Sequence, residues 1–138
     1  MINSRNLDDL DTDVKAKAEA FMAACDAAGI DVLVTSTYRD FESQAALYAQ
    51  GRTTSGNRVT NAKPGQSAHN YRLAFDFVPI VGGKAIWDDD SLWLQCGRIG
   101  MACGLEWGGS WLGFRDRPHM QDLGGKTIEQ LKHEAGVA

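Results

Sequence analysis

An aspartate inside an apolar segment constrains the fold of this chain more than any other feature. The segment LAFDFV, residues 73–78, alternates between large apolar residues on one face and Ala, Asp and Val on the other. Such alternation predicts a strand whose apolar face is buried. An ionised carboxylate in a buried strand is costly unless a positive charge lies against it. We therefore expect Asp76 to contact a basic side chain or a metal ion.

Composition and charge limit the possible classes of protein. The chain of 138 residues is 43% hydrophobic and 23% charged, which is ordinary for a globular protein and predicts one domain over residues 1–138. The net charge of −4 argues against nucleic-acid binding, which requires a basic face. No signal peptide is visible, and no apolar stretch approaches the ~18 residues of a membrane span, so we expect no membrane insertion. The three cysteines form no C-x-x-C pair, and we expect buried free thiols in a reducing compartment.

Periodicity and turn residues predict the secondary structure. Two helices are expected over 9–28 and 40–51. A third is expected to begin at a cap formed by Asp89 or Asp90 and to end at Gly104. The last helix is expected to follow a capping box formed by Thr127 and Gln130. Strands are expected over 30–38, 73–78, 105–107 and 118–121. Because helices and strands do not alternate regularly, we predict an α+β fold, a small antiparallel sheet with flanking helices. The loop over 51–66 is long enough to suggest a functional role.

Two histidines are candidates for a site with Asp76. His69 precedes the aspartate by seven residues, and His119 follows Pro118, which favours an extended segment. Two imidazoles and one carboxylate form a three-ligand set that leaves a fourth position open on a zinc ion, as in catalytic sites. The spacing alone leaves a plain Asp–His hydrogen bond equally open. His133 lies on a polar helix and is expected to be a surface residue.

A metal-dependent hydrolase also needs a carboxylate close to the metal as a general base. Asp116 lies three residues before His119 and can take this role if it lines the same cleft. The alternative is a surface ion pair of Asp116 with Arg115 or Arg117, which would contribute little to stability. Glu106 is a rival candidate for the base.

Three segments together resemble one family. They are STYRDFESQAALYAQGR (36–52), SAHNYRLAFDF (67–77) and GLEWGGSWLGFRDRPHMQ (104–121). They resemble the zinc peptidases that cleave bacterial cell-wall peptides, a group that includes D-alanyl-D-alanine carboxypeptidases, vancomycin-resistance dipeptidases and L-alanyl-D-glutamate endopeptidases. The resemblance covers about residues 30 to 122 in the correct order. The third segment looks most like the endopeptidase branch used as phage lysins. The resemblance implies the fold shared by hedgehog domains and D-Ala-D-Ala peptidases.

The resemblance also implies roles for individual residues. The family's S-x-H-x-x-x-x-x-x-D motif falls on Ser67, His69 and Asp76, and its last histidine on His119; the two histidines and Asp76 would bind one Zn²⁺ per chain. Asp116 would be the general base and Arg39 the oxyanion stabiliser, with an ion pair of Arg39 to Asp40 or Glu42 as the alternative. The substrate-binding candidates are Ser67, Gln44 and Trp111. Ser67 could instead brace its turn, Gln44 could be a supporting residue, and Trp107 and Trp111 could pack in the core. Arg72 stands where many relatives have glycine.

The function implied by this resemblance is zinc-dependent hydrolysis of the L-alanyl-D-glutamate bond in the peptidoglycan stem peptide. The alternatives are a D-alanyl-D-alanine carboxypeptidase or dipeptidase, and a zinc-bearing cell-wall-binding module without catalysis. The start of the sequence and the absence of a separate cell-wall-binding domain fit a monomeric phage endolysin, an antimicrobial lysin. Such an enzyme would stay in the host cytoplasm and reach the cell wall at lysis.

Overall fold

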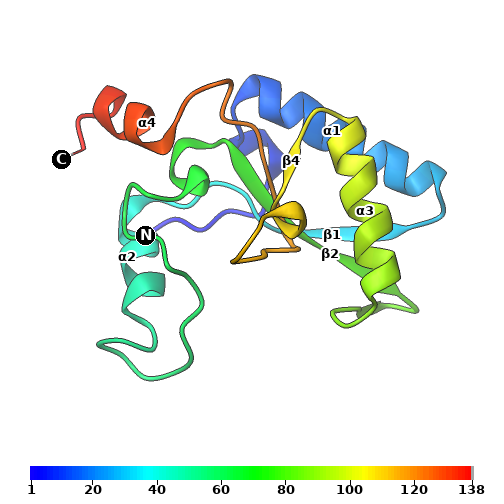
Figure 1. Ribbon diagram of the computed structural model, residues 1–138, viewed down its shortest axis with the longest axis horizontal. Coiled ribbons are helices and arrows are strands. Elements are labelled where there is room, and N and C mark those ends of the chain that lie inside the picture. Colours follow the sequence, from blue (N-terminus) through cyan, green and yellow to red (C-terminus); the bar gives the residue numbers. More distant parts are fainter. Residues whose placement is uncertain (138) are drawn as a thin grey trace.

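Five strands form one antiparallel sheet in the computed structural model, which describes residues 1–137 (Figure 1). The strand order is β1-β2-β5-β4, and β3 pairs with β2 at its end. The strands are β1 (Asp31–Ser36), β2 (Ala74–Val81), β3 (Lys84–Ala85), β4 (Glu106–Trp107) and β5 (His119–Gln121). The helices are α1 (Thr12–Ala27), α2 (Phe41–Ala49), α3 (Asp90–Ala102) and α4 (Ile128–Glu134), with short 3₁₀ turns η1 (Leu7–Asp9), η2 (Ala68–Tyr71) and η3 (Gly108–Ser110). The predicted α+β class is confirmed.

The hydrophobic core lies between the sheet and the helices α1 and α3. The Phe21 ring on α1 lies 5.8 Å from the Phe75 ring and 4.9 Å from the Phe77 ring, both on β2. On α3, Trp93 packs against Phe77 with ring centroids 5.4 Å apart. Met120 on β5 is also wholly buried in this core. The large apolar face of β2 is therefore covered by helices, as its alternation predicted.

Several predicted boundaries shift by a few residues. The first helix begins at Thr12 rather than residue 9, because the Asp11 side chain caps it and η1 precedes it. The first strand ends at Ser36, after an irregularity in its pairing with β2, rather than continuing to residue 38. The capping box of Thr127 and Gln130 at α4 is confirmed.

The cysteines are free thiols, as expected. Cys25 and Cys96 are fully buried, whereas Cys103 is half-buried and caps the C-terminus of α3. Within residues 1–137, no helix has the length and apolar character needed to cross a membrane.

The N-terminal segment braces the connection that follows β1. The Ser4 amide donates to the Tyr38 carbonyl, 2.8 Å away, and the Thr37 amide donates back to the Ser4 carbonyl at 2.7 Å. Asn3 forms a bridge to Arg39 beyond this pair. Residues 36–40 are thereby fixed between the N-terminal segment and the rest of the fold.

Replacing Phe21 by alanine tests the core. Because the Phe21 side chain is fully buried between α1 and the sheet, Phe21→Ala should lower the free energy of unfolding by about 3–5 kcal/mol. Urea denaturation followed by circular dichroism measures this change. The matched control is Glu19→Ala on the exposed face of α1, which should change stability by less than about 0.5 kcal/mol. Equal effects of the two substitutions would contradict this account of the core.

Candidate active site

Adjacent strands bring Asp76 and His119 side by side. Asp76 on β2 pairs with His119 on β5 in the antiparallel register, and with Ser36 on β1 on its other side. Because successive side chains of a strand point to opposite faces, Met120 enters the core while His119 and Gln121 face away from it. Asp76 and His119 therefore meet on the face of the sheet opposite α1 and α3, and Asp76 Oδ1 lies 3.4 Å from His119 Nδ1.

The turn η2 supplies His69 to the same place. The Ser67 side chain accepts a hydrogen bond from the His69 amide at 3.3 Å and so caps the turn. The His69 carbonyl accepts from the Arg39 amide at 3.1 Å. This anchoring places His69 Nε2 3.2 Å from Asp76 Oδ1.

Hydrogen bonds fix which nitrogen of each imidazole faces Asp76. His69 Nδ1–H donates to the Thr37 carbonyl at 2.7 Å, which leaves Nε2 to face Asp76. His119 Nε2–H donates to Gln121 Oε1 at 2.7 Å, which leaves Nδ1 toward Asp76. Metal-binding histidines commonly donate their second N–H in this way. Sequence reasoning missed Thr37 and Gln121. Gln121 could have been found, because it follows His119 by two residues on the same strand and so lies on the same face of the sheet.

The three side chains can hold a metal ion. Their ligand atoms all lie within 4.8 Å of one another. The His69 and His119 side chains are buried, and Asp76 is 23% exposed toward the cavity. Burial raises the pKa of Asp76, but the His69 and His119 imidazoles more than offset it, and the pKa ends below its usual range. An ionised carboxylate beside two imidazole nitrogens is a donor set suited to a divalent transition metal.

A cavity of about 650 Å³ opens above these three residues. We call it the site cavity. Its lining includes Arg39, Ser67, Trp111, Asp116 and Gln121, besides the three candidate ligands, and residues 59–62 of the long loop predicted to be functional. The separate segments singled out in the sequence therefore meet in one place.

Asp116 lies beside the candidate metal ligands. Its Oδ2 is 3.9 Å from His119 Nδ1, and burial raises its pKa, with Asp76 adding to the rise and His119 opposing it. The alternative partner Arg117 pairs with Asp90 instead, at 2.6 Å. The rival base Glu106 is exposed outside the cavity lining and accepts a hydrogen bond from Trp111 Nε1. Asp116, and not Glu106, therefore lines the site cavity beside the candidate metal ligands.

Gly108 determines the position of Asp116. The Asp116 amide donates to the Gly108 carbonyl at 3.0 Å. A Cβ atom on residue 108 would lie 2.3 Å from the Asp116 carbonyl oxygen, which is closer than atoms can approach. Only glycine therefore allows the two segments to meet here.

Arg39 points at Asp76 rather than at its acidic sequence neighbours. Its Nη2 lies 3.8 Å from Asp76 Oδ2, while Asp40 caps α2 and accepts from the Ile2 amide. Burial lowers the pKa of Arg39, and the charges of Asp76 and Asp116 partly offset this effect. Within residues 1–137 the buried Arg39 Nε has no hydrogen-bond partner. An unsatisfied buried donor of this kind carries a desolvation cost.

The three residues expected to contact substrate, Gln44, Ser67 and Trp111, differ in whether they reach the site cavity. Gln44 is fully buried behind Arg39, where its Oε1 accepts from Arg39 Nη1 at 3.0 Å and its Nε2 donates to the Ala62 carbonyl. This placement corrects the expected substrate contact, since Gln44 supports Arg39 and the cavity wall instead. Ser67 braces its turn and also lines the cavity. Trp111 lines the cavity with its ring 5.3 Å from that of His119, whereas Trp107 is buried in the core.

Arg72 is directed away from the site cavity. Its guanidinium lies 3.9 Å from the centre of the Tyr38 ring, and its Nη1 donates to the Asp9 carbonyl at 2.8 Å. Arg72 adopts a left-handed backbone with φ of 64°, the only positive φ among the described residues that are not glycine. This conformation is easiest for glycine and explains why glycine is common at this position in the family pattern.

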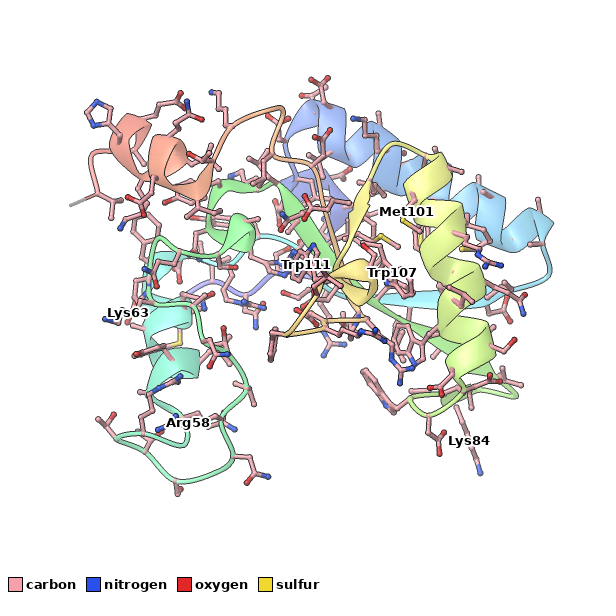
Figure 2. All side chains as sticks on the ribbon, in the orientation of Figure 1. Arg58, Lys63, Lys84, Met101, Trp107 and Trp111 are labelled. Carbon is pink, nitrogen blue, oxygen red and sulfur yellow. The ribbon has the colours of Figure 1, made fainter. Side chains whose placement is uncertain are left out.

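Charge is distributed unevenly around the site cavity. Residues 43–75 contain four basic and no acidic residues, although the whole chain has a net charge of −4. Figure 2 shows Arg58 and Lys63 on the loop beside α2, with Trp111 nearer the centre of the molecule. Residues 59–62 of this loop line the cavity. One wall of the cavity is therefore formed by a segment that contains no acidic residue, although residues 59–62 themselves are neutral.

Comparison with known proteins identifies the family. Residues 7–91 match the VanY family, described as D-alanyl-D-alanine carboxypeptidase. The chain is also 44% identical over 122 residues to the peptidoglycan L-alanyl-D-glutamate endopeptidase CwlK of Bacillus subtilis, covering 82% of this chain and 73% of CwlK. The chain belongs to the VanY family. This confirms the resemblance drawn from the three sequence segments.

A second VanY-family relative comes from a phage. The chain is 31% identical over 124 residues to an L-alanyl-D-glutamate peptidase of Listeria phage A118. The match covers 84% of this chain but 39% of the phage protein, so the phage relative contains a large additional part.

Solved structures share the fold. The L-Ala D-Glu endopeptidase ChiX of Serratia marcescens superposes with a TM-score of 0.63 at 21% identity, over 87% of each chain. A vancomycin-resistance D,D-pentapeptidase VanY, solved in complex with Zn(II), superposes with a TM-score of 0.60 at 16% identity, over 94% of this chain and 80% of that one. These structures confirm the predicted D-Ala-D-Ala-peptidase-like fold.

Metal titration tests the three-residue donor set. Protein freed of metal by a chelator should bind one equivalent of a divalent transition metal, measured by isothermal titration calorimetry. Asp76→Ala should abolish this binding because it removes the ligand that lies between the two imidazoles. His133→Ala, an exposed histidine on α4, should bind metal as the unaltered chain does. Unchanged affinity in folded Asp76→Ala would rule out the site.

Proposed function

We propose that this protein is a zinc-dependent endopeptidase that hydrolyses the L-alanyl-D-glutamate bond of the peptidoglycan stem peptide. The observation that carries the proposal is the convergence of His69, Asp76, His119, Asp116 and Arg39 on one cavity. The specificity is supported by the 44% identity to CwlK, of which the chain covers 73%. Peptidoglycan is accordingly the proposed substrate.

Zinc is the proposed metal because the donor set offers two nitrogens and one oxygen and leaves a position open to the cavity. When bound, the ion would lower the pKa of a water molecule toward ~7 and polarise the scissile carbonyl. The Thr37 carbonyl and Gln121 keep both imidazoles in the orientation that this requires.

Asp116 is the proposed general base. Its raised pKa and its position 3.9 Å from His119 Nδ1 suit a carboxylate that takes a proton from the attacking water. The same carboxyl group then donates this proton to the amino group of the departing D-glutamyl peptide. Its place in the cavity lining gives it access to both groups.

Arg39 is the proposed stabiliser of the negative oxygen that develops on the scissile carbonyl. The guanidinium is held by Gln44 and by Ser36, whose Oγ accepts from Arg39 Nη2 at 3.2 Å. A buried, fixed cation next to the reacting carbonyl stabilises such charge without reorganisation during the reaction.

A D-alanyl-D-alanine carboxypeptidase is the second candidate, because the family description names that activity. Residues 43–75 form one wall of the cavity and contain no acidic residue that would repel an acidic peptide in either case. The non-catalytic binding module has less support, since both Asp116 and Arg39 are in place beside the donor set. The phage origin, residence in the host cytoplasm until lysis, antimicrobial use, single-domain organisation and monomeric state stay predictions.

Product analysis separates the two enzyme candidates. Purified peptidoglycan digested by the protein should yield new amino-terminal D-glutamate, identified by mass spectrometry, and no released D-alanine. Removal of metal by a chelator should stop the reaction, and added Zn²⁺ should restore it. Release of D-alanine alone would establish the carboxypeptidase, and undiminished cleavage in metal-free protein would overturn the zinc mechanism.

Replacing Asp116 by asparagine tests the base. Asp116→Asn keeps the shape of the side chain but cannot accept the proton, so kcat should fall by about 10²–10⁴-fold. The bound zinc, measured by elemental analysis, should remain at one per chain. The matched control is Asp26→Asn, an exposed carboxylate on α1, which should retain full activity. An active Asp116→Asn variant would exclude this role.

A further inference from the structure

A second depression lies next to the site cavity. It has a volume of about 430 Å³ and is lined by Trp87, Trp93, Arg115, Asp116, Arg117 and Pro118. We call it the Trp87 depression. Asp116 and Pro118 also line the site cavity, so the proposed base forms the wall between the two hollows. The two hollows therefore adjoin at Asp116 and Pro118.

The Trp87 depression combines an exposed aromatic face with cationic donors. Trp87 is 54% exposed, which is unusual for such a large apolar side chain. Trp93 beneath it is buried, with ring centroids 6.1 Å apart. Arg115 is exposed at the rim, and the Arg117 guanidinium lies 5.6 Å from the centre of the Trp93 ring. An exposed aromatic side chain in a hollow with polar donors at its edge is typical of a binding site.

The walls of the Trp87 depression are held in place. The Trp87 carbonyl accepts from Trp93 Nε1 at 2.9 Å and from Arg117 Nη2 at 3.2 Å. Arg117 is tied in addition to Asp90, and its carbonyl accepts from Trp107 Nε1 at 2.8 Å. These bonds join the segment before α3 to the segment that carries Asp116. The hollow is therefore preformed, which lowers the entropic cost of binding.

The chemistry of the proposed substrate indicates which of its groups would lie next to Asp116 when it is bound. In peptidoglycan the amino group of L-alanine is joined to the lactyl group of N-acetylmuramic acid. Between the scissile carbonyl and the sugar ring there are only one alanine and one lactyl group, a span of about 7 Å, or two residue lengths. An enzyme that cuts after this alanine must accommodate the sugar within that distance of its catalytic groups. The Trp87 depression begins at one of them, Asp116.

We propose that the Trp87 depression binds the N-acetylmuramyl sugar on the amino side of the scissile bond; this inference rests on the proposed L-alanyl-D-glutamate specificity. The C–H face of the sugar ring packs on the Trp87 indole, and the Arg115 guanidinium donates to oxygen atoms of the sugar substituents. Trp87 and Arg115 are then specificity-determining residues that favour a peptide still attached to the glycan strand over a free peptide.

A pair of matched substrates tests this proposal. One is N-acetylmuramyl-L-alanyl-D-glutamyl peptide, and the other is the same peptide with a simple N-acetyl group in place of the sugar and lactyl group. Trp87→Ala should lower kcat/KM about tenfold for the sugar-bearing substrate, mainly through KM, as expected when a contacting tryptophan is truncated. For the sugar-free substrate it should leave kcat/KM unchanged. Arg115→Ala should show the same pattern with a smaller effect.

Control variants separate sugar binding from general effects. Trp87→Phe keeps an aromatic face and should retain most of the preference for the sugar-bearing substrate. Val81→Ala removes another exposed apolar side chain, and Arg98→Ala removes an exposed arginine on α3; neither residue lines the depression, so neither should alter the preference. Equal losses on both substrates in Trp87→Ala, or no preference in the unaltered enzyme, would overturn the sugar site.

Direct binding tests the depression independently of catalysis. N-acetylmuramyl-L-alanine should bind the unaltered protein, measured by NMR chemical-shift changes at the tryptophan indole groups, and Trp87→Ala should weaken this binding about tenfold. Failure of the protein to cleave either peptide would refute the proposed function but leave this binding measurable. Absence of binding, or binding that Trp87→Ala does not change, would overturn the inference itself.

Discussion

The contact of Asp76 with two imidazoles is the interaction on which the rest of the site depends. A carboxylate on a buried strand is tolerated only with charge or hydrogen-bond compensation, and here its Oδ1 lies 3.2 Å from His69 and 3.4 Å from His119. Because Asp76 pairs directly with His119 in the sheet, a slip of one residue between β2 and β5 would turn one of them into the core. The apolar packing of Phe75, Phe77 and Met120 on the opposite face prevents such a slip. Core packing thus fixes the geometry of the donor set.

Precision in this site comes from groups that orient the catalytic candidates. The Thr37 carbonyl orients His69, and Gln121 orients His119. Gln44 and Ser36 hold Arg39, and the absence of a side chain at Gly108 allows Asp116 to approach. Thr37 is itself held by the N-terminal segment through Ser4. The whole arrangement is therefore braced from several elements, which limits the motion of each catalytic candidate.

Sequence reasoning succeeded where a side chain obeys a local pattern and failed where distant backbone decides its surroundings. The alternation around Asp76, the cap of α4 and the two histidines were all visible in the sequence. The burial of Gln44 behind Arg39 was not, because it depends on the packing of α2 against residue Ala62 of the long loop. The orientation of Arg72 likewise follows from its contact with Tyr38, 34 positions earlier in the chain. Element ends moved for a related reason, since caps such as Asp11 decide where a helix begins.

Charged and aromatic side chains are distributed differently on the two sides of the site, which the overall composition does not reveal. Figure 1 shows α2 and the following loop on one side of the segment after β4, and the start of α3 on the other. The first side belongs to the stretch 43–75, which contains no acidic residue, and the second side carries Trp87 and Trp93. An acidic peptide fits the first side and a neutral sugar face fits the second, with Asp116 between them. A net charge of −4 is therefore no obstacle to binding an anionic polymer, because Coulomb repulsion over a few ångströms depends on the nearby residues rather than on the sum over the chain.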